Sequence, residues 1–163
     1  MTTHAEAKAL VDAVVTDAAQ SLFLRAQSLL EAHYGDAYPG ANNWGSIHES
    51  GDAGSFRHTD TDAHGKSYTT SFAKWSTPQK GIEAMARLTV RRQDVADAIA
   101  AGDLDEAVRL IGEVHHYFEA PLASYQAGVR RCLNTIVDAT GEENPFLEPD
   151  ELPLDSPLRE PWP

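Results

Sequence analysis

The most constraining feature of this sequence is a change of pattern in its middle third. Before residue 36 and between residues 78 and 137, apolar side chains recur at the three- and four-residue spacing of amphipathic helices. Between these two regions the helical spacing disappears, and the chain is interrupted repeatedly by glycine and asparagine, at Gly40, Asn42, Asn43, Gly45, Gly51 and Gly54. The chain is therefore expected to fold as two helical parts separated by a turn-rich segment.

The turn-rich segment contains a pattern typical of a β-hairpin. Residues 55–59 and 66–75 flank the run Asp-Thr-Asp-Ala-His-Gly at positions 60–65. Within the second run, Tyr68, Thr70 and Phe72 alternate with smaller residues at the period of two that a strand requires. Two such runs around a turn that contains glycine predict an antiparallel pair of strands.

Helical patterns flank the hairpin on both sides. On the amino-terminal side we predict one helix over about residues 5–17 and a second that ends at Gly35. On the carboxyl-terminal side we predict one helix up to about Ala100, a next helix with Asp103 as its N-cap, and a last helix over residues 122–137. The predicted fold class is mainly α (α+β), a helical domain with a small β-hairpin lobe.

The last 23 residues differ in composition from the rest of the chain. They carry seven acidic residues and one basic residue, which is half of the formal net charge of −12, and proline recurs at every fourth position from Pro145 to Pro161. Proline fixes φ and lacks an amide donor, so this stretch can form neither a helix nor a central strand. We predict a domain over residues 1–140 and a proline-rich acidic tail over residues 141–163. Interspersed apolar residues favour an extended arm along the body or a partner; a solvated tail is the alternative.

Charge and cysteine content exclude several classes of protein. The negative net charge argues against a nucleic-acid partner and against an anionic membrane surface, because both attract clusters of Lys and Arg. Cys132 is the single cysteine, which excludes an internal disulfide and a cysteine-based zinc site. The seven histidines show no helix-spaced ligand pair, so we predict no metal site and no cofactor. No apolar run approaches the ~20 residues that would span a bilayer.

Aromatic side chains gather around the predicted hairpin. Seven of the 13 aromatic residues lie between Tyr34 and Trp75, among Asn, Ser, Thr and Asp. Such a mixture is typical of a sugar-binding groove, in which rings stack on the sugar and polar groups bind its hydroxyls. A β-lobe that uses the rings as its own core is the alternative. Glu31 stands just before this region on an apolar helix end, where burial would raise its pKa and let it donate a proton. Taken alone, this is weak evidence, because a glutamate at a helix end is usually a solvated surface residue.

Four short motifs carry a resemblance to a known family. The chain has AQSLLEAHYG at 26–35, NNWGSI at 42–47, FAKWST at 72–77 with GIEA at 81–84, and Tyr117 and Tyr125 before an apolar helix. These motifs are similar, in the same order, to AQAALESGWG, NNLFGIK, FRxYxS…xEA and GYATDPxYAxKL. Over roughly residues 20–137 the chain thus resembles the bacterial glucosaminidase family, which includes flagellar peptidoglycan hydrolase domains and autolysins. The resemblance implies a lysozyme-like fold.

The resemblance also implies a reaction and the residues that perform it. The family hydrolyses the β-1,4 bond after N-acetylglucosamine in peptidoglycan, and Glu31 matches its general acid. Its second acidic group lies on the hairpin, where Asp60, and after it Asp62, are the nearest equivalents; ordinary turn-forming aspartates are the alternative. A substrate-assisted route, in which the sugar's acetamide attacks, needs no second carboxylate, and Tyr117 would then help to orient the acetamide. We predict sugar contacts from Trp44, Tyr68, Trp75 and Tyr117.

Some residues depart from the family's motifs. Ala32-His33 stands in place of Ser-Gly, Gly45-Ser46 in place of Phe-Gly, and His48 in place of Lys. A non-catalytic glycan-binding or protein-interaction module on a lysozyme-like scaffold therefore remains the alternative function. The amino terminus shows no secretory signal, so we expect delivery to the cell wall by phage, a secretion system or lysis. A delivery or inhibitor protein that docks on the acidic tail is a further expected partner.

Overall fold

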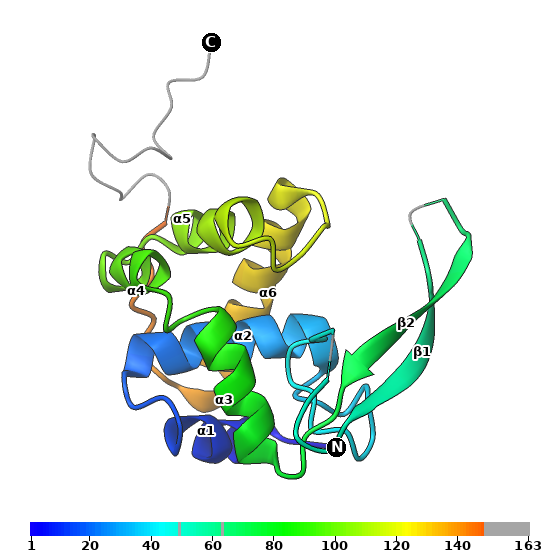
Figure 1. The fold of residues 1–163 in the computed structure, drawn as a ribbon. Helices are drawn as coiled ribbons and strands as arrows, with labels where there is room; N and C mark the ends of the chain where they lie inside the picture. Colours follow the sequence, from blue (N-terminus) through cyan, green and yellow to red (C-terminus); the bar gives the residue numbers. More distant parts are fainter. Residues whose placement is uncertain (49, 63, 149–163) are drawn as a thin grey trace.

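The computed structural model describes residues 1–48, 50–62 and 64–148, and these residues form a mainly helical body with a two-stranded lobe (Figure 1). The elements, in chain order, are α1 (His4–Asp12), α2 (Ala18–Ala32), β1 (Ser55–Thr61), β2 (Ser67–Ala73), α3 (Pro78–Leu88), α4 (Gln93–Ala100), α5 (Leu104–Arg109), the π-helical turn η1 (Leu110–Val114) and α6 (Leu122–Thr140). The predicted fold class, mainly α with a small β-hairpin, is confirmed.

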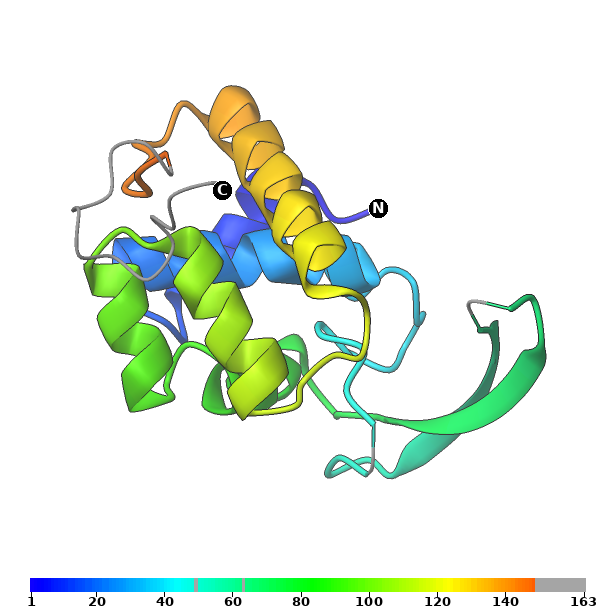
Figure 2. The same cartoon turned by 90° about the horizontal axis from the view of Figure 1, so that it is seen from above.

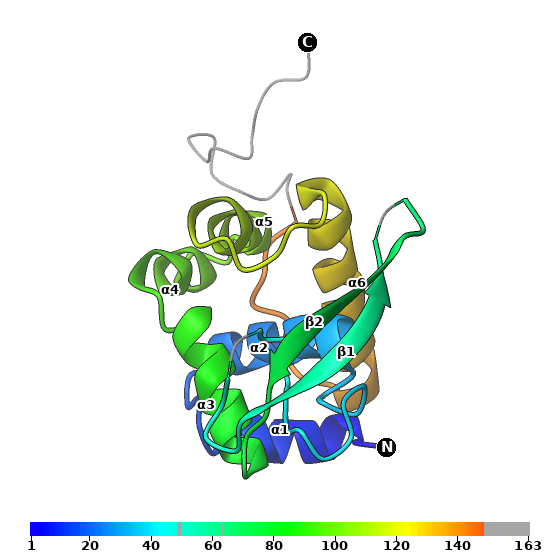
Figure 3. The ribbon, with the colours of Figure 1, turned by 45° about the vertical axis from the view of Figure 1, so that its right-hand side comes forward.

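Helix α2 runs through the centre of the molecule. All residues from Ser21 to Ser28 are buried, which is the pattern of a helix covered on every side. Helices α1, α4 and α6 pack against it, and Figures 1 and 3 show α1 on one side of α2, α4 and α5 on the other, and α6 crossing it. The central position of α2 fixes the location of the motif at its carboxyl-terminal end, which contains Glu31.

Side-chain caps explain where several helices begin. Thr3 forms a capping box with Glu6 at the start of α1, and Asp17 accepts a hydrogen bond from the Gln20 amide at the start of α2. Asp103 accepts a hydrogen bond from the Glu106 amide, so its predicted role as the N-cap of α5 is confirmed.

The single helix predicted from Pro78 to Ala100 is wrong, because the structure breaks it into α3 and α4. Thr89 ends α3 with φ −129° and ψ −95°, outside the helical region. Its hydroxyl donates to the Met85 carbonyl at 2.7 Å, and the Arg91 amide turns back to bond Ala86 at 2.9 Å. These bonds satisfy the last carbonyls of α3 locally, which lets the chain change direction although the apolar spacing continues.

The predicted hairpin is confirmed, with Ser55 opposite Ala73 and Thr61 opposite Ser67. Since side chains alternate across a strand, one face of the hairpin carries six side chains: Phe56, His58 and Asp60 from β1, and Tyr68, Thr70 and Phe72 from β2. Figure 2 shows the hairpin as a curved arm that projects from the helical body beside the end of α2. The base of the arm is fixed by a hydrogen bond from the Ala73 amide to the Ile47 carbonyl.

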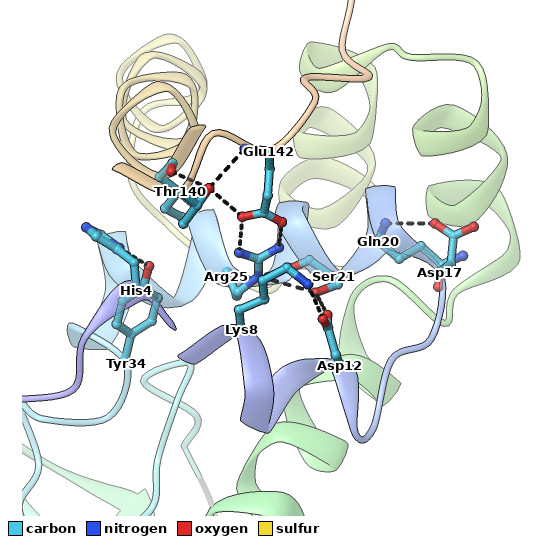
Figure 4. Close-up of polar contacts among 11 residues, drawn as sticks. His4, Lys8, Asp12, Asp17, Gln20, Ser21, Arg25, Tyr34, Thr140 and Glu142 are labelled. Atoms are coloured by element: carbon cyan, nitrogen blue, oxygen red, sulfur yellow. Dashed lines mark hydrogen bonds and ion pairs between the residues drawn. The ribbon is translucent and has the colours of Figure 1, made fainter. Parts of the chain in front are cut away.

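The chain continues to pack on the body after the predicted domain boundary at residue 140. Glu142 forms a two-pronged ion pair with Arg25 of α2, with distances of 2.6 and 2.8 Å (Figure 4). Phe146 is buried in the main core, 6.2 Å from the ring of Phe23, and the Leu147 amide bonds to the Gly102 carbonyl. Residues 141–148 therefore belong to the folded body. The rest of the predicted tail, residues 149–163, lies outside the described residues.

None of the helices in the described part of the chain has the length and apolar character needed to cross a membrane.

Candidate active site

A cavity of about 690 Å³ lies where the end of α2, the hairpin and α6 meet. Figure 2 shows the carboxyl-terminal end of α2 between α6 and the hairpin. The loop from η1 to α6 closes one side. The residues that line the cavity include acidic, aromatic and small side chains, among them Glu31, Tyr38, Gly45, Ser46, His48, Asp60, Tyr68, Phe72, Tyr117, Glu119, Ser124, Tyr125 and Arg131. A cavity of this size and mixed lining can hold a carbohydrate segment.

Glu31 lies at the wall of this cavity, on the last turn of α2. Its side chain is partly buried, and burial raises the pKa of its carboxyl above the ordinary value. The Tyr125 hydroxyl donates to Glu31 Oε1 at 2.6 Å and opposes this rise. Within the described residues, no Lys, Arg or His forms an ion pair with this carboxylate. Glu31 is thus a carboxyl held in a poorly solvated place by neutral groups.

A hydrogen-bond chain from the interior holds Tyr125 against Glu31. Gln27, one turn before Glu31 on α2 and fully buried, donates from Nε2 to the Tyr125 hydroxyl at 3.1 Å. Because that hydroxyl oxygen accepts from Gln27, its proton points to Glu31. The ring of Tyr125 stacks on Phe118, with 3.6 Å between the ring centroids. The sequence did not reveal that Gln27 and Tyr125 support Glu31. The available signal was the four-residue spacing of Gln27 and Glu31, which places both side chains on one face of α2.

The loop after α2 is organised by the buried side chain of Asn43. Its amide donates to the carbonyls of Ile47 and Ala73, and its oxygen accepts from the Ile47 amide. This arrangement turns Ser46 toward the cavity, where its hydroxyl donates to the backbone carbonyl of Glu31 at 2.8 Å. The loop is thereby joined both to the end of α2 and to the base of the hairpin.

Two departures from the family's motifs fall at left-handed backbone positions. His33, which caps α2, has φ 48°, and Ser46 has φ 52°. Both positions carry glycine in the motifs that the sequence resembles, and glycine adopts this conformation without the steric cost that other residues pay. The backbone conformation expected of those glycines is therefore present here, although the glycines themselves are not.

The third departure, glycine at position 45, makes room for Tyr117. The Tyr117 hydroxyl donates to the Gly45 carbonyl at 2.6 Å. A Cβ at position 45 would lie 2.1 Å from that hydroxyl oxygen and 3.0 Å from Met85, so any larger side chain requires Tyr117 to move. Burial and the charge of Glu31 raise the pKa of Tyr117 well above its ordinary value, which keeps it protonated. Tyr117 lines the cavity, and its hydroxyl proton is bound to the Gly45 carbonyl of the loop.

The hairpin contributes Asp60 and Tyr68 to the other wall of the cavity. They are opposite each other in the register, both are exposed, and both line the cavity. Tyr38, which stacks on Phe72 of the hairpin, also lines the cavity: burial raises its pKa, and the charges of Glu31 and Asp60 add to the rise. Asp62 does not line the cavity. Its Oδ1 accepts from the amides of His64 and Lys66, which is the turn-forming role weighed as the alternative.

The two tryptophans predicted to contact sugar are corrected by the structure. Trp44 is 3% exposed within the main core, where it packs against Tyr34. Trp75 is 8% exposed and packs with Ala73 and Ala84 under the hairpin. Neither indole lines the cavity, and a buried ring cannot offer its face to a sugar. Their aromatic character serves packing, as the alternative reading of this region proposed.

The histidines near the cavity pack against rings or polar groups. His48 stacks on Phe72 with 4.7 Å between centroids, and its Nδ1 lies 3.1 Å from the Thr70 hydroxyl. His58 packs edge-on against Tyr38 and Phe72. In the described part of the chain, no three His, Cys, Asp or Glu side chains gather in a way that could hold a metal ion.

A comparison with solved structures identifies a protein of similar fold. The catalytic domain of the autolysin Auto from Listeria monocytogenes superposes with a TM-score of 0.51 and 15% sequence identity, over 83% of this chain and 84% of that one. At this level of identity the similarity concerns the fold. No protein-family model and no curated protein sequence matches this chain.

Proposed function

We propose that this protein hydrolyses peptidoglycan at the β-1,4 bond after N-acetylglucosamine, with Glu31 as the general acid. The observation that carries the proposal is Glu31 itself: a carboxyl with a raised pKa, on the wall of a 690 Å³ cavity, with no ion-pair partner in the described residues. The shared fold with an autolysin catalytic domain supports a cell-wall glycan as the substrate.

The environment of Glu31 suits proton donation to a glycosidic oxygen. A general acid must hold its proton near neutral pH, and burial raises the pKa of Glu31 in that direction. Once the proton has left, the Tyr125 hydroxyl already points at Oε1 and stabilises the carboxylate that forms. The same hydrogen bond fixes the rotamer of Glu31, so the acid is oriented before the substrate binds.

Two routes can stabilise the positive charge that develops on the sugar. Asp60 faces the cavity from the hairpin and is the only one of the two predicted hairpin aspartates, Asp60 and Asp62, that lines it. In the substrate-assisted route, the acetamide of the N-acetylglucosamine attacks instead, and no second carboxylate is needed. Tyr117 would then orient the acetamide through its ring or its hydroxyl oxygen, because its proton is bound to Gly45.

Aromatic and polar groups along the cavity can bind the sugar rings. Tyr68 is 45% exposed on the hairpin and Tyr38 lies at its base, so both can stack on pyranose faces. Ser124 on α6 and Asp60 on the hairpin can bind hydroxyls from opposite walls. The glycan would then run across the end of α2, between the hairpin and α6.

The test is the release of muropeptides from purified peptidoglycan by the wild-type protein, Glu31→Gln and Glu143→Gln. Glu143 is exposed and lies outside the cavity, so its variant matches the change of charge without touching the site. We expect release by the wild type and by Glu143→Gln, and a loss of at least about 100-fold in Glu31→Gln. Mass analysis of the new reducing ends should show N-acetylglucosamine. Equal release by all three proteins would remove Glu31 from the mechanism, and binding without release by any of them would favour the non-catalytic module.

A companion variant, Asp60→Asn, separates the two routes. A loss comparable to that of Glu31→Gln would assign the second catalytic group to Asp60. A change of less than about threefold would favour the substrate-assisted route.

A further inference from the structure

The charges around the cavity are distributed unevenly. Glu31, Asp60 and Glu119 line it as acidic residues, whereas Arg131 is the sole Lys or Arg among the described residues that line it. Neutral sugar hydroxyls can accept single hydrogen bonds from an arginine, whereas a carboxylate matches both the charge and the two-pronged geometry of its guanidinium. The position of this guanidinium therefore indicates an anionic group on the ligand.

Arg131 has no acidic partner among the described residues, although its neighbour on α6 does. Arg130 forms ion pairs with Asp105 at 3.2 Å and with Glu148 at 3.6 Å, and both hold it against the body. Arg131 is exposed, and none of the described carboxylates lies within ion-pair distance of it, Glu119 included. Its guanidinium is free to bind an anion from solvent.

The placement of Arg131 on α6 relates it to the catalytic carboxyl. The cavity-facing stripe of this helix contains Ser124, Tyr125, Gly128 and Arg131. Six residues of α-helix separate Tyr125, which holds Glu31, from Arg131, so the two lie about 9 Å apart along the helix axis. Gly128, between them, lets α6 pack directly on Leu30, because a Cβ at this position would come within 3.0 Å of the Leu30 side chain. Arg131 is thus placed to contact a group on a sugar next to the bond that is cleaved.

We infer that Arg131 binds a carboxylate of the peptide that peptidoglycan carries, so that the preferred substrate is a peptide-bearing glycan rather than a bare one. This inference rests on the proposed function. Peptide-bearing sugars alternate with unsubstituted N-acetylglucosamine along the strand, so a peptide always adjoins the sugar at the cleaved bond. Arginine stays charged at all working pH values and binds carboxylates with two parallel hydrogen bonds.

The experiment compares two glycans and three proteins. Soluble peptidoglycan strands are used intact, or after an amidase has removed their peptides and the lactyl carboxylates freed by that cleavage have been converted to neutral methylamides. The variants are Arg131→Gln and, as a control of equal charge change, Arg87→Gln, which alters an exposed residue of α3 outside the cavity. We measure kcat/KM on both glycans, and we measure the Kd of both glycans by calorimetry in the inactive Glu31→Gln background.

We expect Arg131→Gln to lower kcat/KM and to weaken binding by about fivefold on peptide-bearing strands, with little change on stripped strands. Arg87→Gln should leave both unchanged. An equal effect of Arg131→Gln on both glycans, or an effect on neither, overturns the inference. If the wild type cleaves neither glycan, the proposed function fails. The binding measurement still decides the role of Arg131 in that case, since a peptide-dependent loss of affinity supports it and the lack of such a loss refutes it.

Discussion

Removing the charge of Glu142 is expected to destabilise the fold strongly, although this residue lies in the stretch whose composition predicted a separate tail. Glu142 binds both guanidinium nitrogens of Arg25, whose side chain is 1% exposed on the central helix. The Thr140 hydroxyl donates to the same carboxylate at 2.7 Å (Figure 4). In Glu142→Gln the shape is kept, but Arg25 remains as a buried charge without a counter-charge at this position.

The magnitude follows from the pKa of Glu142. The hydrogen bonds from Arg25 lower it from 4.5 to about 2. A shift of this size corresponds to about 3 kcal/mol at neutral pH. The carboxylate keeps 19% of its side-chain surface exposed, so solvent screens part of this interaction, and about 2 kcal/mol is the expected loss. Since the folded pKa is lowered, this contribution is complete above pH 4.5 and is lost as the pH falls toward 2.

The assay is urea unfolding followed by circular dichroism, for the wild type, Glu142→Gln and Glu143→Gln. Glu143 is the exposed neighbour, and its variant should change the free energy of unfolding by less than about 0.5 kcal/mol. The difference between the wild type and Glu142→Gln should be about 2 kcal/mol at pH 7 and should shrink at pH 3. A difference as small as that of Glu143→Gln, or one that does not change with pH, would refute the reasoning.

Three further changes test the site and its surroundings. His33→Gly should raise the free energy of unfolding by about 0.5–1 kcal/mol in chemical denaturation, since glycine relieves the left-handed cap at φ 48°; a destabilised variant would contradict this. Gly45→Ala should lower that free energy by about 1–3 kcal/mol, because its Cβ would meet the Tyr117 hydroxyl at 2.1 Å; unchanged unfolding would show that the loop gives way. Tyr125→Phe should move the alkaline limb of the kcat/KM profile to higher pH, since the lost hydrogen bond favoured ionised Glu31; a shift to lower pH would oppose the assigned role.

The parts of the fold that depend on local pattern could be predicted from the sequence. The end of α2, the hairpin and the Asp103 cap each follow from spacing or from turn-forming residues within a few positions. The break at Thr89 could not be predicted, because the apolar spacing continues through it and only the side-chain bond to Met85 reveals the turn. A period of apolar residues indicates which face is buried, and it does not report whether the helix axis continues straight.

The contacts that define the site join distant parts of the chain, and for this reason pattern alone could not supply them. Tyr125 and Glu31 are 94 positions apart, and Arg25 and Glu142 are 117 positions apart. The burial of Trp44 was not predicted for the same reason. The sequence shows an aromatic residue among polar ones, but its burial depends on packing against Tyr34 and the rest of the core. Tyr68, by contrast, lies between the exposed residues Ser67 and Thr69 on the hairpin and is itself 45% exposed, so its ring is accessible to a ligand.

The central helix contains two ionisable side chains, Arg25 and Glu31, whose surroundings differ in charge. Arg25 is fully buried, and the structure supplies a complete counter-charge from Glu142, brought by the last described segment of the chain. Glu31, six residues later on the same helix, meets neutral groups instead: the hydroxyl of Tyr125, itself held by neutral Gln27, and the hydroxyl of Ser46. A charge kept only for stability would be paired as Arg25 is, because an unpaired buried charge costs free energy. The neutral surroundings of Glu31 instead favour its protonated form, and they are what a proton donor at the wall of a glycan-sized cavity requires.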